Sequence, residues 1–153
     1  MKVYIAADHA GFYLKKQLIE YLKLKDYEVE DLGAYEENPD DDYPDFIVPC
    51  ARKVASNTRS VGIVIGGSGQ GEAIAANKVK GIRCALFYGP STSSGFEIVR
   101  LAREHNDTNV LSLGARFLNP DDAKKAITIW LETKFDEASR HQRRHDKIAK
   151  IEK

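Results

Sequence analysis

Four glycines and a carboxylate follow an apolar run near the middle of the chain. Residues 61–65 are apolar and rich in β-branched side chains, which predicts a short buried strand. The glycines that come next are Gly66, Gly67, Gly69 and Gly71. Glycine lets the backbone take positive φ and approach a ligand closely, and Glu72 then opens a run of good helix formers. The loop therefore predicts an anion site at a helix N-terminus, suited to a phosphate, a carboxylate or an enolate.

The position of Glu72 excludes two familiar phosphate loops. A P-loop that began at Gly66 would need lysine at position 72, and a dinucleotide-binding fingerprint that began at Gly67 would need glycine there. A carboxylate among anion-binding amides suits a base that takes a proton, with the amides stabilising the oxyanion that forms. The same residues also fit an ordinary strand-to-helix turn in which Glu72 is a favourable first-turn acid. The loop alone leaves both interpretations open.

The elements that must position this loop alternate along the chain. Hydrophobic patterns predict strands over 2–7, 27–32, 61–65, 82–87 and 109–113. Helices are predicted over 11–24, from 44 onward, over 72–78, up to about 103 and over 120–133. Pro49 suggests a kink or a later start in the second helix, and the tail from Asp136 is predicted to be helical and too polar for the core. Five alternations imply an α/β fold with a parallel sheet and helices on both faces, whose strand order the pattern does not reveal.

Polar side chains stand just after three of the predicted strands. Asp8 and His9 follow the first strand, the glycine loop follows the third, and Arg116 follows the fifth. Ligands of parallel α/β sheets bind beyond the carboxyl ends of the strands, so these groups are expected at one edge. Taken alone, Asp8 would be a helix cap and His9 a packed surface imidazole.

Other polar residues have a functional and a plain interpretation as well. His105 and Asn106 follow the fourth predicted helix, where they would also suit a helix C-terminus as a dipole partner and a turn former. Arg140 and Arg144 share one face of a helix and could grip a phosphate, although a solvated basic helix has the same pattern. Tyr43, in an acidic loop, could be an exposed anchor.

Composition limits the class of protein. At 153 residues, with 42% hydrophobic and 30% charged content, the chain is expected to be one soluble domain over 1–153 with a helical tail at 135–153. The sequence contains no membrane-spanning run and no signal-peptide pattern, so a cytoplasmic location is expected. Cys50 and Cys84 lack metal-type spacing and are expected to be buried, reduced thiols. The 23 acidic and 23 basic side chains cancel, which disfavours nucleic acid and favours a small anionic ligand.

Five motifs together resemble one enzyme family. They are 7–11 (ADHAG), 42–44 (DYP), 66–78 (GGSGQGEAIAANK), 105–110 (HNDTNV) and 140–144 (RHQRR). In this order, over residues 2 to about 148, they are similar to the type B ribose-5-phosphate isomerases, whose family also contains the galactose-6-phosphate isomerase subunits. The resemblance implies a Rossmann-like three-layer α/β/α fold with a five-stranded parallel sheet. It also implies a homodimer or dimer of dimers, with active sites that draw residues from two subunits.

The resemblance further implies roles for individual residues. His105 would donate the proton that opens the furanose ring. The backbone amides that would stabilise an enediolate belong to Gly67, Gly69, Gln70 and Gly71. The residues that would hold the phosphate are His9, Arg116, Arg140 and Arg144, and those that would orient the sugar hydroxyls are Asp8, Tyr43 and Asn106. No cofactor and no metal are expected, because fixed donors already serve the developing oxyanion.

Two features depart from the family pattern. Many members use as base a cysteine at the position of Gly66, whereas members without it carry a glutamate at the start of the next helix. Glu72 matches this second subtype and is the expected base, with Ser68 beside it as a hydroxyl donor, while both cysteines of this chain map elsewhere. The segment 88–96 is longer than the family's connection, which leaves the identity of the substrate open.

The sequence thus predicts metal-independent interconversion of ribose 5-phosphate and ribulose 5-phosphate. A six-carbon substrate such as allose or galactose 6-phosphate is the alternative within the family, because the longer segment could accommodate it. A sugar-phosphate-binding module without chemistry is a third interpretation, supported by Gly66 and opposed by the retention of Glu72, Ser68 and His105. A flavodoxin-like nucleotide-binding domain fits the alternation but not the two failed fingerprints.

Overall fold

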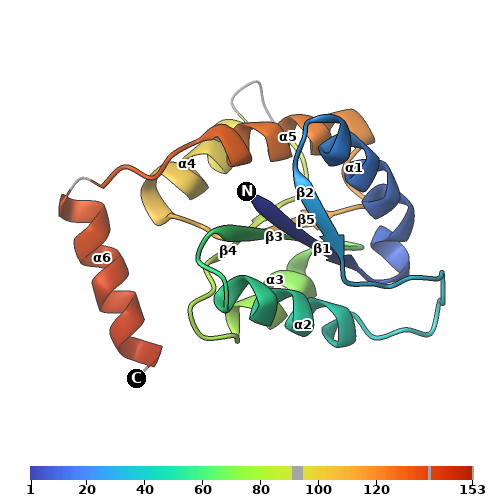
Figure 1. Cartoon of the computed structure of the whole chain (residues 1–153), viewed down its shortest axis with the longest axis horizontal. Helices are drawn as coiled ribbons and strands as arrows, with labels where there is room; N and C mark the ends of the chain where they lie inside the picture. The colour runs from blue at the N-terminus through green and yellow to red at the C-terminus, as the bar shows by residue number, and fades with distance from the viewer. Residues whose placement is uncertain (91–94, 138, 153) are drawn as a thin grey trace.

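The computed structural model describes residues 1–90, 95–137 and 139–152, and a five-stranded sheet forms its centre (Figure 1). The strands are β1 (Lys2–Ala7), β2 (Glu28–Asp31), β3 (Ser60–Gly66), β4 (Cys84–Phe87) and β5 (Val110–Gly114). Every pairing is parallel, and the order across the sheet is β2-β1-β3-β5-β4. The predicted parallel sheet is confirmed, and its order places β1, β3 and β5 in the middle.

Helices cover both faces of the sheet. They are α1 (Phe12–Leu24), α2 (Pro44–Ala55), α3 (Gln70–Asn77), α4 (Glu97–Asn106), α5 (Pro120–Glu132) and α6 (Ser139–Ala149), with short 3-10 turns η1 (His9–Gly11) and η2 (Lys150–Glu152). One face carries α1, α4 and α5, the other carries α2 and α3, and α6 extends away from the sheet (Figure 1). The predicted three-layer fold with a helical tail is confirmed. Within the described ranges, no helix is both long and apolar enough to cross a membrane.

Two apolar cores lie on opposite faces of β3, whose residues are all buried. One core packs Leu18 of α1 and Trp130 of α5 against the sheet, and the other packs Ile47 of α2. The Nε1 atom of Trp130 donates a 2.8 Å hydrogen bond to Oγ1 of Thr108, so the polar atom of this large buried ring has a partner. Because helices cover both faces, β3 is apolar from Val61 to Ile65 instead of alternating, which made it easy to predict.

The second helix begins at Pro44, so the later start that Pro49 suggested is wrong. Proline suits the first helical turn because an amide there has no helical partner. Pro49 removes one helical hydrogen bond further along, but α2 continues past it to Ala55. Its buried face, which includes Ile47 and Val54, packs on the sheet and outweighs that loss.

The fourth strand begins two residues later than predicted. Residues 82 and 83 lie before the strand, because the amide of Ile82 closes a turn onto the carbonyl of Val79 at 3.1 Å. The amide of Arg83 instead donates to a side chain, to Oδ1 of Asn109 at 2.8 Å. Regular pairing with β5 therefore starts only at Cys84.

The C-terminal tail differs from expectation at one residue. Helix α6 forms as predicted, and Arg140 and Arg144 on it are exposed. His141 is only 2% exposed, however, because its ring stacks on the ring of His105 with centroids 4.4 Å apart. The expectation that the tail is too polar for burial is therefore wrong at His141, where two flat imidazoles cover each other.

Candidate active site

The end of β1 brings Asp8 and His9 to the carboxyl edge of the sheet. The Asp8 side chain is buried, and its Oδ1 accepts hydrogen bonds from the amides of Ala10 (3.0 Å) and Gly11 (3.2 Å). Asp8 therefore caps the short turn η1, as its plain interpretation suggested. The His9 side chain is 29% exposed and remains accessible to a ligand.

The glycine loop follows β3 at the same edge. Gly69 has φ +75°, and a side chain there would meet Leu86 at 2.6 Å, so this position requires glycine on two grounds. Oγ of Ser112 holds the loop by donating to the Gly69 carbonyl at 2.7 Å. Among the hydrogen bonds of the described residues, none uses the amides of Gly67, Ser68 or Gly69 as donors, which leaves them open to a ligand. The exposed Ser68 accepts a 3.3 Å bond from the amide of Gln70, where α3 begins.

The carboxylate of Glu72 lies inside this loop. Glu72 is 4% exposed and stands in the first turn of α3. Burial, assisted by the nearby charge of Asp8, raises the pKa of Glu72 above its ordinary value, while its own backbone hydrogen bond acts in the opposite direction. A side chain built on Gly66 would overlap this carboxylate. A side chain at position 66 would therefore require the Glu72 carboxylate to move from the position it holds here.

Arg116 and Tyr43 complete the cluster at the carboxyl edge. The amide of Arg116 donates to the carbonyl of Gly67 at 3.0 Å, and a side chain on Gly67 would lie 3.1 Å from the guanidinium carbon. A side chain on Gly71 would lie 2.7 Å from the ring of Tyr43. The structure therefore brings the ends of β1, β3 and β5 and the start of α2 to one loop. The proximity of Arg116 also lowers the pKa of His9 slightly against other, larger effects.

Asp41 belongs to this cluster although sequence reasoning missed it. Its Oδ1 accepts from the His9 backbone amide at 3.1 Å and lies 2.6 Å from His9 Nδ1. Asp41 is one of three consecutive aspartates in the acidic loop, and nothing in the sequence distinguishes it from Asp40 or Asp42. Only the path of the loop selects it.

Asp8, His9 and Asp41 each place one potential metal ligand within 4.8 Å of the others. Hydrogen bonds already engage a carboxylate oxygen of Asp8, a carboxylate oxygen of Asp41 and Nδ1 of His9. These bonds account for the grouping without a cation. The expectation that the reaction needs no metal stays a prediction, which chelator treatment tests.

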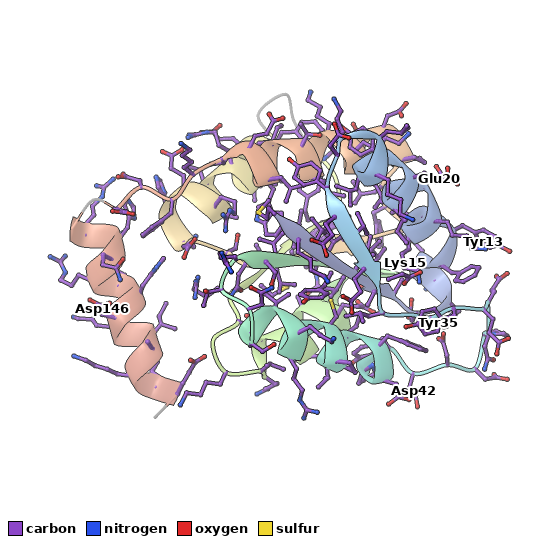
Figure 2. The ribbon with its side chains drawn as sticks, in the orientation of Figure 1. Tyr13, Lys15, Glu20, Tyr35, Asp42 and Asp146 are labelled. Atoms are coloured by element: carbon purple, nitrogen blue, oxygen red, sulfur yellow. The ribbon has the colours of Figure 1, made fainter. Side chains whose placement is uncertain are left out.

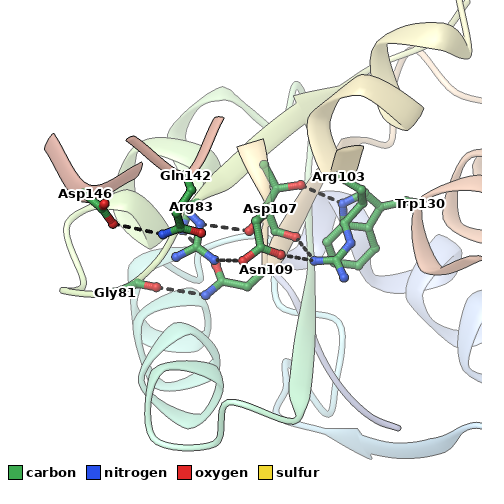
Figure 3. Close-up of polar contacts among 9 residues, drawn as sticks. Gly81, Arg83, Arg103, Asp107, Asn109, Trp130, Gln142 and Asp146 are labelled. Atoms are coloured by element: carbon green, nitrogen blue, oxygen red, sulfur yellow. Dashed lines mark hydrogen bonds and ion pairs between the residues drawn. The ribbon is translucent and has the colours of Figure 1, made fainter. Parts of the chain in front are cut away.

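His105 and Asn106 lie at the opposite, amino edge of the sheet. Helix α4 runs antiparallel to the strands and ends there, just before β5 begins. Asp107 ends the helix in a left-handed conformation (φ 42°), and Arg83 holds it by donating from Nε to its carbonyl (2.8 Å) and from Nη2 to its Oδ2 (2.7 Å) (Figure 3). On the other side of this turn, Arg103 donates to the carbonyl of Thr108 at 2.6 Å. The end of α4 is therefore held rigidly by a polar network.

The tail joins His105 at this edge. Nε of Arg140 donates a 3.2 Å hydrogen bond to Nε2 of His141, and the His141 ring covers that of His105. Burial, then the neighbouring His105 and Arg140, lower the pKa of His141. The exposed Arg140 and Arg144 thus lie on the helix that stacks His141 on His105, and carboxylates of Glu104 and Asp136 lie 3.8 Å from the two rings.

Within one chain, the two groups of side chains are far apart. Between them runs β5, whose five residues at about 3.3 Å each separate the edges by roughly 16–20 Å. The structure thus collects Asp8, His9, Tyr43, Glu72 and Arg116 in one place and His105, Asn106 and Arg140 in another. Neither group contains all the residues that the sequence assigned to the site.

Comparisons with known proteins agree with this architecture. Residues 3–148 match the model of a family described as Ribose/Galactose Isomerase. The chain belongs to the ribose/galactose isomerase family. A family member from Mycobacterium leprae, named ribose-5-phosphate isomerase B, is 44% identical over 153 residues, which are 100% of this chain and 91% of that protein.

Solved structures of family members have the same fold. The ribose-5-phosphate isomerase B of Mycoplasma genitalium, solved with bound ribulose 5-phosphate, superposes with a TM-score of 0.91 at 41% identity, covering 99% of this chain and 95% of that one. The enzyme of the same name from Clostridium thermocellum gives a TM-score of 0.90 at 42% identity, covering 99% and 97%. The predicted family is therefore confirmed, whereas the choice of Glu72 as the base stays a prediction.

Proposed function

We propose that this protein interconverts ribose 5-phosphate and ribulose 5-phosphate through an enediolate. Relatives of 41–44% identity that cover nearly the whole chain are named ribose-5-phosphate isomerase B, and one was solved with the ketose product. The observation that carries the proposal is the buried carboxylate of Glu72 beside unpaired loop amides. A carboxylate of raised pKa is a better base, and the amides supply the charge stabilisation that proton removal next to a carbonyl requires.

The chemistry follows from this pairing. Glu72 takes the proton from C2 of the open-chain aldose, and the electron pair of that C–H bond forms the C1–C2 double bond while the carbonyl oxygen becomes an oxyanion. The amides of Gly67 to Gly71 stabilise the oxyanion, and Ser68 offers a hydroxyl to the same oxygens. Glu72 then returns its proton to C1, and the proton of the C2 hydroxyl moves to O1, which leaves a ketone at C2. No net oxidant or reductant is needed.

The phosphate and the ring-opening step need the second group of residues. His9 and Arg116 lie at the carboxyl edge and would hold the phosphate there together with Arg140 and Arg144. His105, the proposed proton donor for ring opening, and Asn106 lie at the amino edge. Since one chain keeps these sets roughly 16–20 Å apart, the proposed site is shared: a second copy of the chain supplies His105, Asn106, Arg140 and Arg144. A homodimer is the smallest assembly that satisfies this requirement.

The direct test is an isomerase assay on purified protein treated with a chelator. We expect ribose 5-phosphate to be converted to ribulose 5-phosphate at a rate that added divalent cations do not change. Loss of activity with chelator and its return with a metal would contradict the metal-independent mechanism. Binding of ribose 5-phosphate without turnover would favour a non-catalytic binding module.

One observation favours a six-carbon substrate as the second candidate. The segment after β4 is long, and its residues 91–94 lie outside the described part of the chain. Its start lies at the carboxyl edge, where Tyr88 approaches Gly114 and its ring lies 6.0 Å from that of Phe117, next to Arg116. Allose and galactose 6-phosphates assayed beside ribose 5-phosphate decide between the two, and exclusive turnover of either would move the assignment to a six-carbon sugar.

A further inference from the structure

The acidic loop between β2 and α2 returns to the end of β1 and places one carboxylate on His9. Oδ1 of Asp41 lies 2.6 Å from Nδ1 of His9 and also accepts from the His9 backbone amide at 3.1 Å. The side chain of Asp41 is 7% exposed, although its neighbours Asp40 and Asp42 are exposed. One buried oxygen atom therefore fixes both the backbone and the ring of His9.

Helix α1 holds the loop on its path. Nζ of Lys15, which is 1% exposed, donates to Oδ1 of Asp31 (2.6 Å) and to the carbonyl of Ala34 (2.7 Å). Further along, the hydroxyl of Tyr13 donates to Glu37. Figure 2 shows Tyr13, Lys15 and Tyr35 on the same side of the molecule as Asp42, where α1 faces the loop. The loop that delivers Asp41 is thus anchored at several points, and the contact with His9 is built into the fold.

The second carboxylate oxygen of Asp41, Oδ2, is also buried. Within the described part of the chain, Oδ2 of Asp41 is buried without a hydrogen-bond partner. Buried polar atoms are nearly always paired, so an unpaired carboxylate oxygen costs stability unless a neighbouring positive charge compensates. His9 can supply this charge when each of its two ring nitrogens carries a proton. This arrangement therefore stabilises the charged form of the His9 imidazole.

The charged groups around His9 act in both directions. The hydrogen bond to Asp41 is the largest influence and raises the pKa of His9, and the charges of Asp8 and Asp41 add to it. Partial burial and the charge of Arg116 lower the pKa, but the net shift is upward. With Nδ1 bound to Asp41, Nε2 is the ring nitrogen left for a ligand. A charged imidazole beside the Arg116 guanidinium suits a phosphate dianion.

We propose that Asp41 is a positioning residue that holds His9 in the orientation in which Nε2 donates to the substrate phosphate. The identity of that ligand rests on the proposed function, but the pairing of Asp41 with His9 does not. Asp41 itself touches no reacting atom. It acts through His9, so its loss should weaken phosphate binding and leave the proton transfer at Glu72 unchanged.

The test compares Asp41→Asn with Asp40→Asn, a control of identical chemistry at the neighbouring exposed position. Imidazole signals of histidine-labelled protein are followed by NMR against pH, with His9→Gln used to assign His9 among the four histidines. We expect the midpoint of His9 to fall in Asp41→Asn and to stay in place in Asp40→Asn. An unchanged midpoint in Asp41→Asn would overturn the proposal. This readout needs no substrate, so it holds even if the protein does not isomerise ribose 5-phosphate.

Steady-state kinetics of the Asp41→Asn variant provide a second test of the proposal. We expect Asp41→Asn to raise KM for ribose 5-phosphate about tenfold with kcat within about twofold, the loss expected for one hydrogen bond to a charged group. Titration with inorganic phosphate should show the same weakening. In the His9→Gln background, Asp41→Asn should add nothing, because its effect passes through His9. An equal KM effect in that background, or a loss confined to kcat, would show that Asp41 acts otherwise.

A third variant separates positioning from folding. Asp41→Glu keeps the negative charge but displaces it by one methylene. We expect it to keep the His9 midpoint raised while KM still increases, because the ring is held in a different orientation. If Asp41→Glu binds phosphate as well as the unaltered protein does, the orientation of His9 is not what Asp41 controls, and the proposal fails.

Discussion

At the carboxyl edge of the sheet, Glu72, His9 and Arg116 meet around a loop held by the chain's own contacts, whereas at the amino edge His105 stacks on His141 beside two exposed arginines. The carboxyl edge holds the proposed base, loop amides that have no hydrogen-bond partner among the described residues, and two of the proposed phosphate ligands. The amino edge holds the proposed proton donor His105, and carboxylates of Glu104 and Asp136 lie 3.8 Å from the rings of His105 and His141. Each edge therefore has proposed site residues that the other edge lacks.

The direction of the strands and helices explains why the proposed site residues fall into two groups. The strands of a parallel sheet all point to one edge, so loops after β1, β3 and β5 gather there without help from another chain. Helices between those strands run back and end at the other edge, which carries the end of α4 to the opposite side. Residues of both kinds can meet only if the carboxyl edge of one copy faces the amino edge of another.

The largest effect is expected at the base. Glu72→Gln removes the carboxylate that we propose as the acceptor of the C2 proton but keeps its size, so kcat should fall by about 10²–10⁴-fold, the usual contribution of a general base. KM should change little, because Glu72 holds neither the phosphate nor a hydroxyl. Steady-state kinetics measure both, with Glu20→Gln on the exposed face of α1 as the control. Near-normal turnover by Glu72→Gln would remove Glu72 from its proposed role.

The second prediction concerns the sharing of the site. Glu72→Gln and His105→Asn chains, each inactive alone, are refolded together so that mixed dimers form. If the site takes Glu72 from one copy and His105 from the other, each mixed dimer has one intact site, and random pairing restores about a quarter of full activity.

The control for this mixing experiment pairs Glu72→Gln with the double variant Glu72→Gln/His105→Asn, which cannot form an intact site. It should stay inactive. Absence of recovery in the first mixture, when light scattering shows that dimers have formed, would mean that Glu72 and His105 of one chain serve the same site. The proposal that one site combines the carboxyl edge of one copy with the amino edge of another would then be wrong.

The third prediction tests the fit between Gly66 and Glu72. A side chain at position 66 would overlap the Glu72 carboxylate, so Gly66→Ala should displace the base and lower kcat about 10–100-fold, since small misplacements of catalytic groups are costly. In the Glu72→Ala background the overlap is gone, and Gly66→Ala should have little further effect on kcat. Additive losses in the two backgrounds would show that Gly66 matters for a reason other than room for Glu72.

The smallest expected effect is on stability and its pH dependence. Burial raises the pKa of Glu72 in the folded chain above the ordinary value of 4.5, which applies to the unfolded chain. At pH values between the unfolded-state pKa and the folded-state pKa, the folded chain therefore keeps a proton that the unfolded chain has lost. The free energy of unfolding therefore falls as pH rises through this window and then levels off. Glu72→Gln lacks this loss and should be the more stable protein at neutral pH. Urea unfolding from pH 4 upward measures the difference in free energy of unfolding between Glu72→Gln and the unaltered protein. A difference that does not grow with pH would contradict the raised pKa.

Much of the fold could be predicted because its signals are local. The apolar run that forms β3, the helix formers after Glu72 and the proline at the start of α2 act within a few residues of themselves. The glycine loop was readable for the same reason, since positive φ and close approach are properties of single residues. Element bounds were less certain, as the late start of β4 shows, because a tertiary contact between Arg83 and Asn109 decides where pairing begins.

The candidate site was predictable only in part. Residue types indicated an acid–base group at Glu72, whereas the phosphate-binding roles expected for His9 and Arg116 came from the family resemblance. Asp41 could not be singled out, because three consecutive aspartates look alike until the loop folds back on β1. The burial of His141 was missed for a similar reason, since only the docking of the tail on α4 gives its ring a partner.

Residues close together in the chain were enough to predict the alternation of strands and helices, and they indicated a loop suited to an anion after β3, with Glu72 at the start of the next helix. These depend on hydrophobic period, backbone freedom and residue chemistry, which neighbouring residues set. Four features became visible only in the folded chain: the strand order, the overlap of a side chain at Gly66 with Glu72, the pairing of Asp41 with His9, and the separation of His105 from Glu72. Those features arise where segments distant in the chain pack together, and the free energy of that packing is not written in any single stretch of residues.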